Sequence, residues 1–240
     1  MDVYAISDLH LSGYQPKPMD VFGENWRDHW AKIRADWYKR VHESDLVLIP
    51  GDISWAMRLS EALVDLKQIE EMPGTKIILK GNHDYWWSSL TRLTSELNET
   101  MLVLQNNAFD FEDVSIAGTR GWTCPSSKEF KAEDEKIYLR EVERLRLSLE
   151  RIKPREDRKI IAMMHYPPFN EKREPTGFTD LFEKFGVDTV LYGHLHDASA
   201  GMSFNGVHNG IVYQNVSCDF LEFKLKKVEF STDVDWMTGR

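Results

Sequence analysis

The chain has 240 residues, of which 42% are hydrophobic, and a formal charge of −9. This length is sufficient for one large domain with a full core, and the acidic balance argues against a broad electrostatic surface for DNA or RNA. No apolar stretch approaches the roughly 18 to 20 residues that a membrane span needs.

Short apolar runs alternate with helical patterns along the chain. The expected strands are 2–7, 45–50, 76–80, 101–104, 114–117, 159–164, 187–192, 211–216 and 220–230, and the expected helices are 26–41, 59–71, 133–152 and 178–185. Strands that alternate with helices predict an α/β sheet protein. The chain has no internal repeat and no Pro/Gly/Ser-rich linker, which favours a single domain over residues 1–240. For the last ten residues, 231–240, the sequence favours neither an ordered nor a disordered tail.

A stripe of large apolar residues marks the first expected helix. Trp26, Trp30, Ile33, Trp37 and Val41 recur at helical spacing, which is typical of an amphipathic helix with one face on a sheet. We therefore interpret the tryptophans as core residues and not as a stacking platform for a ligand.

Potential metal ligands follow five of the expected strands, at the points where the strands end. They are Asp8 and His10, then Asp52, then Asn82, His83 and Asp84, then His165, and finally His194 and His196. Ligands of open α/β sheets gather beyond the carboxyl ends of the strands, so we expect these side chains to lie close together. Five of the eight histidines of the chain are among them.

The residue types at the strand ends indicate which metals they would bind. Taken singly, His165 could be a buried histidine bonded to a backbone carbonyl and Asp52 a turn cap, but the five strand ends together favour a metal site. Imidazoles, carboxylates and one amide, without a thiolate, suit Mn, Fe, Co, Ni or Zn better than Ca. The candidates outnumber the ligands of one tetrahedral ion, so we expect two ions that share a carboxylate, with Asp52 as the bridge.

The order of the motifs resembles that of the calcineurin-type metallophosphoesterases. The matching motifs are "DLH" at 8–10, "GD" at 51–52, "GNHD" at 81–84, the lone His165 and "GHLH" at 193–196. The resemblance implies that Asp8, His10, Asp52 and His196 hold one metal, while Asp52, Asn82, His165 and His194 hold the other. It also implies a four-layer α-β-β-α sandwich with two mixed β-sheets and the dimetal site at the strand ends. The second motif departs from the pattern, because "GDISW" lacks the further acidic or amide residue that many relatives carry after "GD".

The activity that the resemblance implies is the hydrolysis of a small phosphomonoester or phosphodiester with two divalent ions, for which we expect manganese, with iron or zinc as alternatives. A hydroxide that bridges the metals would attack phosphorus, and His83, which is not a ligand, would assist the leaving group. Asp84 would accept the other ring N–H of His83 and favour the protonated imidazole. Arg120, in the expected loop 118–130, is either a phosphate-binding residue or an ordinary solvated arginine.

The same fold also allows two other functions, a nuclease and a catalytically inactive interaction module. A nuclease is disfavoured by the acidic balance of the chain, and a catalytically inactive interaction module is disfavoured because no ligand of the set is missing. No signal peptide is visible at the N-terminus, and Cys124 and Cys218 are expected to be free thiols. We therefore expect a cytoplasmic protein with a small phosphate ester as its partner and no association with a membrane.

Overall fold

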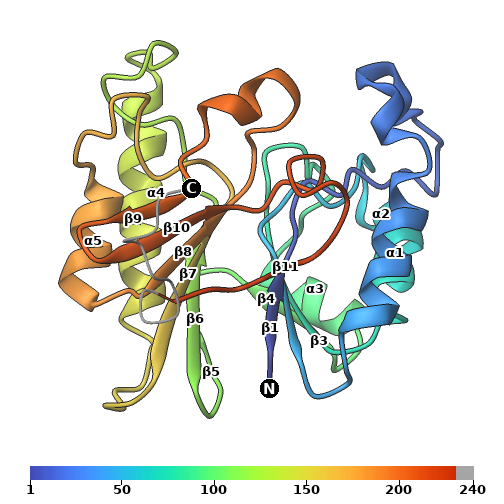
Figure 1. Cartoon of the computed structure of the whole chain (residues 1–240), viewed down its shortest axis with the longest axis horizontal. Helices are drawn as coiled ribbons and strands as arrows, with labels where there is room; N and C mark the ends of the chain where they lie inside the picture. The colour runs from blue at the N-terminus through green and yellow to red at the C-terminus, as the bar shows by residue number, and fades with distance from the viewer. Residues whose placement is uncertain (231–240) are drawn as a thin grey trace, which may run out of the picture.

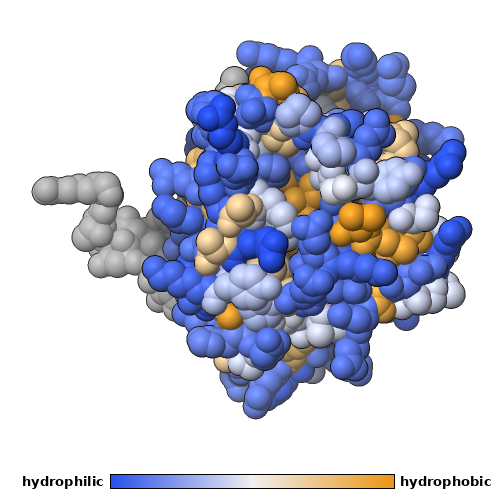
Figure 2. Space-filling view, turned by 90° about the vertical axis from the view of Figure 1, so that its right-hand side faces the viewer, coloured by the Kyte–Doolittle hydropathy of each residue, from blue (hydrophilic) through white to orange (hydrophobic). Residues whose placement is uncertain are grey.

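A computed structural model describes residues 1–230, in which two β-sheets pack face to face between helices (Figure 1). The C-terminal segment 231–240 lies outside the described residues. Within residues 1–230, no helix is long and apolar enough to cross a membrane. Figure 2, which faces the side of α1 and α2, shows a mostly hydrophilic surface with hydrophobic side chains in small groups.

The first sheet has the strand order β11-β1-β2-β3-β4. Four of its strands are parallel, and β11 runs antiparallel to β1. The strands are β1 (Val3–Ala5), β2 (Leu46–Ile49), β3 (Thr75–Leu79), β4 (Met101–Leu104) and β11 (Lys226–Lys227), and the associated helices are α1 (His29–Arg40), α2 (Leu59–Glu70) and α3 (Leu90–Glu96).

The second sheet has the order β5-β6-β7-β8-β10-β9, with β5 and β9 as antiparallel edge strands. Its strands are β5 (Phe109–Asp110), β6 (Val114–Thr119), β7 (Lys159–Met164), β8 (Thr189–Tyr192), β9 (Gly206–His208) and β10 (Ile211–Asn215), and its helices are α4 (Asp134–Leu149) and α5 (Gly177–Phe185). Three short 3₁₀ helices, η1 (Met19–Phe22), η2 (Glu24–Trp26) and η3 (Asp197–Met202), lie in the connections.

The alternation of side chains along the strands explains the layers. In β2, Leu46 and Leu48 join the apolar cluster between the two sheets, whereas Val47 and Ile49 join the cluster beneath α1 and α2. Since successive side chains of a strand point to opposite faces, a strand that is apolar on both faces must be covered on both. The expected four-layer sandwich with two mixed sheets is therefore confirmed.

Two sequence expectations about elements need correction. Residues 220–230 do not form one strand, because Glu222 and Phe223 adopt left-handed backbone angles and only β11 pairs. The first helix begins at His29 and not at Trp26, which lies in η2. Trp26 and Trp37 are nonetheless fully buried in the core, as predicted, and both cysteines are buried free thiols.

Candidate metal centre

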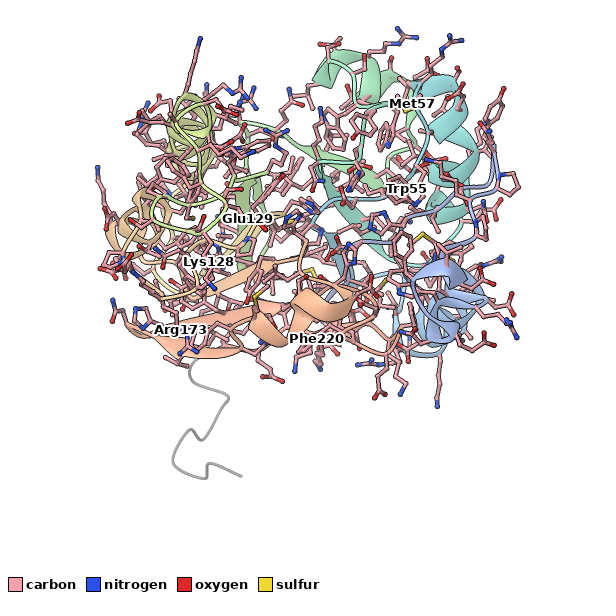
Figure 3. All side chains as sticks on the ribbon, turned by 90° about the horizontal axis from the view of Figure 1, so that it is seen from above. Trp55, Met57, Lys128, Glu129, Arg173 and Phe220 are labelled. Carbon is pink, nitrogen blue, oxygen red and sulfur yellow. The ribbon has the colours of Figure 1, made fainter. Side chains whose placement is uncertain are left out.

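The carboxyl ends of β1, β2, β3, β7 and β8 meet at one edge of the sandwich. Figure 3 looks down on this edge, with Trp55 on the side of the first sheet and Glu129 on the side of the second. The backbone N–H of His194, just after β8, donates to both carboxylate oxygens of Asp8, just after β1, at 3.2 and 3.1 Å. The loops of the two sheets are thus in direct contact at this edge.

The carboxylate of Asp52 lies between two histidines. Its Oδ2 atom is 3.9 Å from Nε2 of His10 and 3.4 Å from Nε2 of His165, and its Oδ1 atom accepts the backbone N–H of His83 at 2.8 Å. Asp8 is shared by two groups of potential ligands, one with His10 and His196 and one with Asp52 and His165. In each group one ligand atom per residue lies within 4.8 Å of the others.

The amide oxygen of Asn82 completes the cluster. It is 2.6 Å from Nε2 of His165 and 3.0 Å from Nδ1 of His194. Atoms that bind one ion at about 2.1 Å in octahedral geometry lie about 3 Å from each other, so this spacing fits a shared cation. The structure brings together all seven side chains expected as ligands, namely Asp8, His10, Asp52, Asn82, His165, His194 and His196.

An unusual backbone conformation directs several of these side chains. Asp8, His10, Asp52 and His194 have φ angles of 57°, 46°, 51° and 68°. This left-handed region is uncommon outside glycine and costs about 1–3 kcal/mol per residue, and such residues gather at functional sites. Left-handed residues in the loops that follow the strands turn the chain sharply, so each loop presents its side chain at the edge of the sheet.

Two glycines of the motifs allow the loops to approach one another. A Cβ atom on Gly81 would lie 2.1 Å from Oδ1 of Asp52, and one on Gly193 would lie 2.5 Å from Oδ2 of Asp8. Any side chain at either position would therefore displace a carboxylate of the cluster.

Unpartnered polar atoms at the centre of the cluster test whether a cation fits. Both ring nitrogens of His10 and Oδ2 of Asp52 are buried and have no hydrogen bond, while the ring of His10 stacks on Trp55 at 4.7 Å. Buried polar atoms almost always have a partner, and leaving one without a partner is costly. A divalent cation would provide a partner for one ring nitrogen of His10 and for Oδ2 of Asp52, so the residues fit the metals that the sequence predicts.

The charge states of the cluster also suit a metal. Burial lowers the pKa of His10 and of His194 to about 3, so both imidazoles are neutral, which is the form that binds metals. Burial opposes the charges of Asp52 and His165, but their mutual attraction prevails. It holds the pKa of Asp52 below its usual range and raises the pKa of His165 to about 9. A cation bound between Asp52 and His165 would take the place of the proton on His165, because a metal-binding imidazole is neutral.

The expectation that Asp84 orients the ring of His83 is wrong. The buried carboxylate of Asp84 accepts the backbone N–H groups of Gly81, Ile53 and Ser54 and the indole N–H of Trp86 at 2.7 to 3.2 Å. Nδ1 of His83 is buried without a hydrogen bond, and burial lowers the pKa of His83. Adjacent residues in this tight turn point apart, so Asp84 joins two loops and does not favour the protonated form of His83.

Of the two alternatives for Arg120, a phosphate-binding residue or an ordinary solvated arginine, the second is wrong. Its side chain is 17% exposed, and its Nη2 atom is 3.5 Å from Oε1 of Glu141. The guanidinium lies over the ring of Trp122 at 4.7 Å. Its backbone oxygen accepts the N–H groups of His165 and Tyr166 at 3.1 and 2.9 Å.

Sequence reasoning missed two acidic residues beside the cluster. Asp197 accepts from Nδ1 of His196 at 3.1 Å and from the indole of Trp26 at 3.0 Å, and its backbone N–H donates to Asp219 at 2.6 Å. His196, Asp197 and Asp219 form a third group of potential ligands. The same strand-end rule could have found Asp219, which follows β10.

A pocket of about 320 Å³ adjoins the cluster on the side of the second sheet. His194 forms part of its wall, together with the aromatic rings of Tyr166, Phe169, Tyr192 and Phe204. Tyr166 lies against His194 with 4.1 Å between ring centroids. The pocket therefore places aromatic rings next to a candidate metal ligand, where an organic group of a ligand could pack.

Comparisons with known proteins give a matching family model and structures of similar fold. A family model described as "Calcineurin-like phosphoesterase" matches residues 1–198. The structure is similar to that of phosphopantetheinyl hydrolase from Mycobacterium tuberculosis, with 16% identity, a TM-score of 0.59 and 95% of each chain covered. A protein of unknown function from Aquifex aeolicus is 14% identical with a TM-score of 0.49, covering 93% of this chain and 94% of that one. No curated protein sequence matches the chain.

Proposed function

The chain belongs to the calcineurin-like phosphoesterase family, and from this premise we propose that it hydrolyses a small phosphomonoester or phosphodiester with the help of two divalent cations. The observation that carries the proposal is the convergence of seven potential ligands from five strand ends, with buried ring nitrogens of His10 that have no hydrogen bond. We propose manganese as the cation, with iron or zinc as alternatives.

The proposed ligand sets divide the cluster between two ions. Asp8, His10, Asp52 and His196 would hold one cation, and Asp52, Asn82, His165 and His194 the other. The contacts of Asp52 with His10 and with His165, one from each set, support its role as the shared carboxylate. When bound, the cations would lower the pKa of a water molecule toward about 7 and offset the charge of the phosphate.

His83 is the proposed proton donor to the leaving group. Its backbone N–H donates to Oδ1 of Asp52 at 2.8 Å. The centroid of its half-buried ring lies 4.7 Å from the ring centroid of Trp55 and 5.9 Å from that of His10. The negative charge of a bound phosphate would favour the protonated imidazole and so oppose the effect of burial. The organic part of the substrate would occupy the pocket beside His194 that Tyr166, Phe169, Tyr192 and Phe204 line.

The proposal is tested by metal content and turnover together. We expect the purified protein to contain two metal ions per chain and to hydrolyse p-nitrophenyl phosphate or its bis-ester. Asp52→Asn removes the shared negative charge, so it should lose most of the metal and slow turnover at least about 100-fold. Asp113→Asn, at an exposed position, is the control and should behave as the wild type. Full turnover by Asp52→Asn or by metal-stripped protein would refute the proposal.

A further inference from the structure

A second pocket, of about 300 Å³, lies where β3, β4 and β6 end beside α4. We call it the basic pocket, because its wall contains Lys80, Arg120, Arg140 and Arg144 with a single carboxylate, Glu141. Its other lining residues carry no charge. Four cations and one anion give the pocket a formal charge of +3 (4 − 1), in a protein whose total formal charge is −9.

The single carboxylate does not satisfy the donors around it. Nη1 of Arg144 is 2.8 Å from Oε1 of Glu141, but Nη2 of Arg120 is 3.5 Å and Nε of Arg140 is 3.7 Å from the same oxygen. The other oxygen of Glu141 accepts the hydroxyl of Thr119 at 2.7 Å. Nε of Arg120 is buried without a hydrogen bond. Three guanidinium groups therefore share one oxygen atom.

Another arginine of α4 shows the usual arrangement on a helix surface. Arg146 pairs with two carboxylates of its own, Glu143 and Glu150. Arg140 and Arg144 are 53% and 40% exposed, so both could turn toward a ligand. The excess of donors over acceptors is specific to the basic pocket and is not a general property of the helix.

The loops that carry candidate metal ligands also form the wall of this pocket. Lys80 precedes Asn82 by two residues, which places their Cα atoms within about 7 Å. The backbone oxygen of Arg120 accepts the N–H of His165, and Trp87 belongs to the loop that carries His83. A molecule with one phosphoryl group at the metals can therefore place a second group nearby.

We propose that the basic pocket binds a second phosphoryl group of the substrate, so that the preferred substrates are bisphosphates or diphosphates. This inference rests on the proposed function. Phosphoryl groups suit the pocket because the planar guanidinium makes paired, charge-assisted hydrogen bonds to phosphate oxygens, and three guanidiniums with Lys80 match a dianion. A free phosphate ion has the same chemistry, and the experiments below separate the two sources.

The first experiment measures anion binding without catalysis. Inorganic sulfate, a dianion that the enzyme cannot hydrolyse, is titrated into the metal-loaded protein by calorimetry. The double variant Arg140→Gln/Arg144→Gln should bind sulfate at least about tenfold more weakly than the wild type. Arg146→Gln is the matched control and should bind as the wild type does. Equal affinity in all three proteins would overturn the proposal that the basic pocket binds an anion, because sulfate bound elsewhere contributes equally to each protein.

The second experiment identifies the source of the phosphoryl group. Phosphate release is compared for AMP, ADP and adenosine 3′,5′-bisphosphate. The wild type should favour at least one nucleotide with two phosphoryl groups over AMP, and the double variant should lose this preference by about tenfold through a higher KM. Sulfate binding without such a preference would show that the pocket binds a free anion and not a phosphoryl group of the substrate.

If no ester is hydrolysed by any protein, the proposed function fails, while the sulfate titration still shows whether the basic pocket binds an anion. Lys80→Gln, which leaves α4 unchanged, repeats both tests if the double variant does not fold.

Discussion

Asp84 shows what one buried carboxylate contributes to the site. It accepts four N–H groups from the loops that carry the second and third motifs, and burial together with the charge of Asp52 raises its pKa to about 6. It is therefore a positioning residue that fixes the distance between the loops of Asp52 and Asn82. Because Asp84 and His83 are adjacent in the sequence, we predicted that their side chains interact. The sequence alone does not show in which direction each side chain points from the turn.

The role of His83 can be tested by the dependence on the leaving group. His83→Ala should keep both metals, because no expected ligand is lost. It should slow alkyl phosphates by about 10²–10⁴ and p-nitrophenyl phosphate much less, because p-nitrophenolate leaves without a proton. The exposed His42→Ala serves as the control. Equal slowing of both esters, or loss of metal, would show that His83 is not the proton donor.

Gly81 should tolerate no side chain. In Gly81→Ala the new methyl group would overlap Oδ1 and the backbone nitrogen of Asp52, which lie 2.1 and 2.2 Å from the Cβ position. We expect a loss of metal and a fall of about 2–4 kcal/mol in the free energy of unfolding, measured by urea denaturation. Gly201→Ala is the control, because nothing lies within 4 Å of its Cβ position. A Gly81→Ala protein with unchanged metal content would contradict the described packing of the loops.

At the scale of elements, short continuous apolar runs predicted the central strands, because each is buried on both faces. The short edge strands β5 and β9 and the seven-residue α3 were missed, since so few residues leave no period to detect. The sequence also did not predict the buried lysine of β3. The Nζ atom of Lys76 donates to the carbonyls of Glu70 and Met72, at the end of α2, at 3.1 and 2.7 Å.

This lysine should make stability depend on pH in alkaline solution. Burial lowers the pKa of Lys76 from 10.5 to about 8. Between these values the unfolded chain binds more protons than the folded protein, so stability rises with pH. Relative to Lys76→Met, the wild type should gain about 1–3 kcal/mol in unfolding free energy between pH 7.5 and about 10. The measurement is urea denaturation, with the exposed Lys39→Met as the control. A difference that does not change with pH would show that Lys76 is not buried as described.

At the scale of the whole molecule, the candidate centre exists only where the two sheets meet. Asp8, His10, Asp52 and Asn82 follow strands of the first sheet, whereas His165, His194 and His196 follow strands of the second. The motifs predicted which residues converge because strand ends of α/β sheets share one edge. The two pockets could not be predicted, because their walls come from segments that only the packing of the sheets brings together.

The central claim is that these strand ends hold two cations around the carboxylate of Asp52. The most direct measurement is an anomalous difference map from a crystal grown with Mn²⁺. We predict two strong peaks per chain, one contacted by His10 and the other by His165, with Asp52 touching both. A single peak, or peaks away from these side chains, would contradict the account.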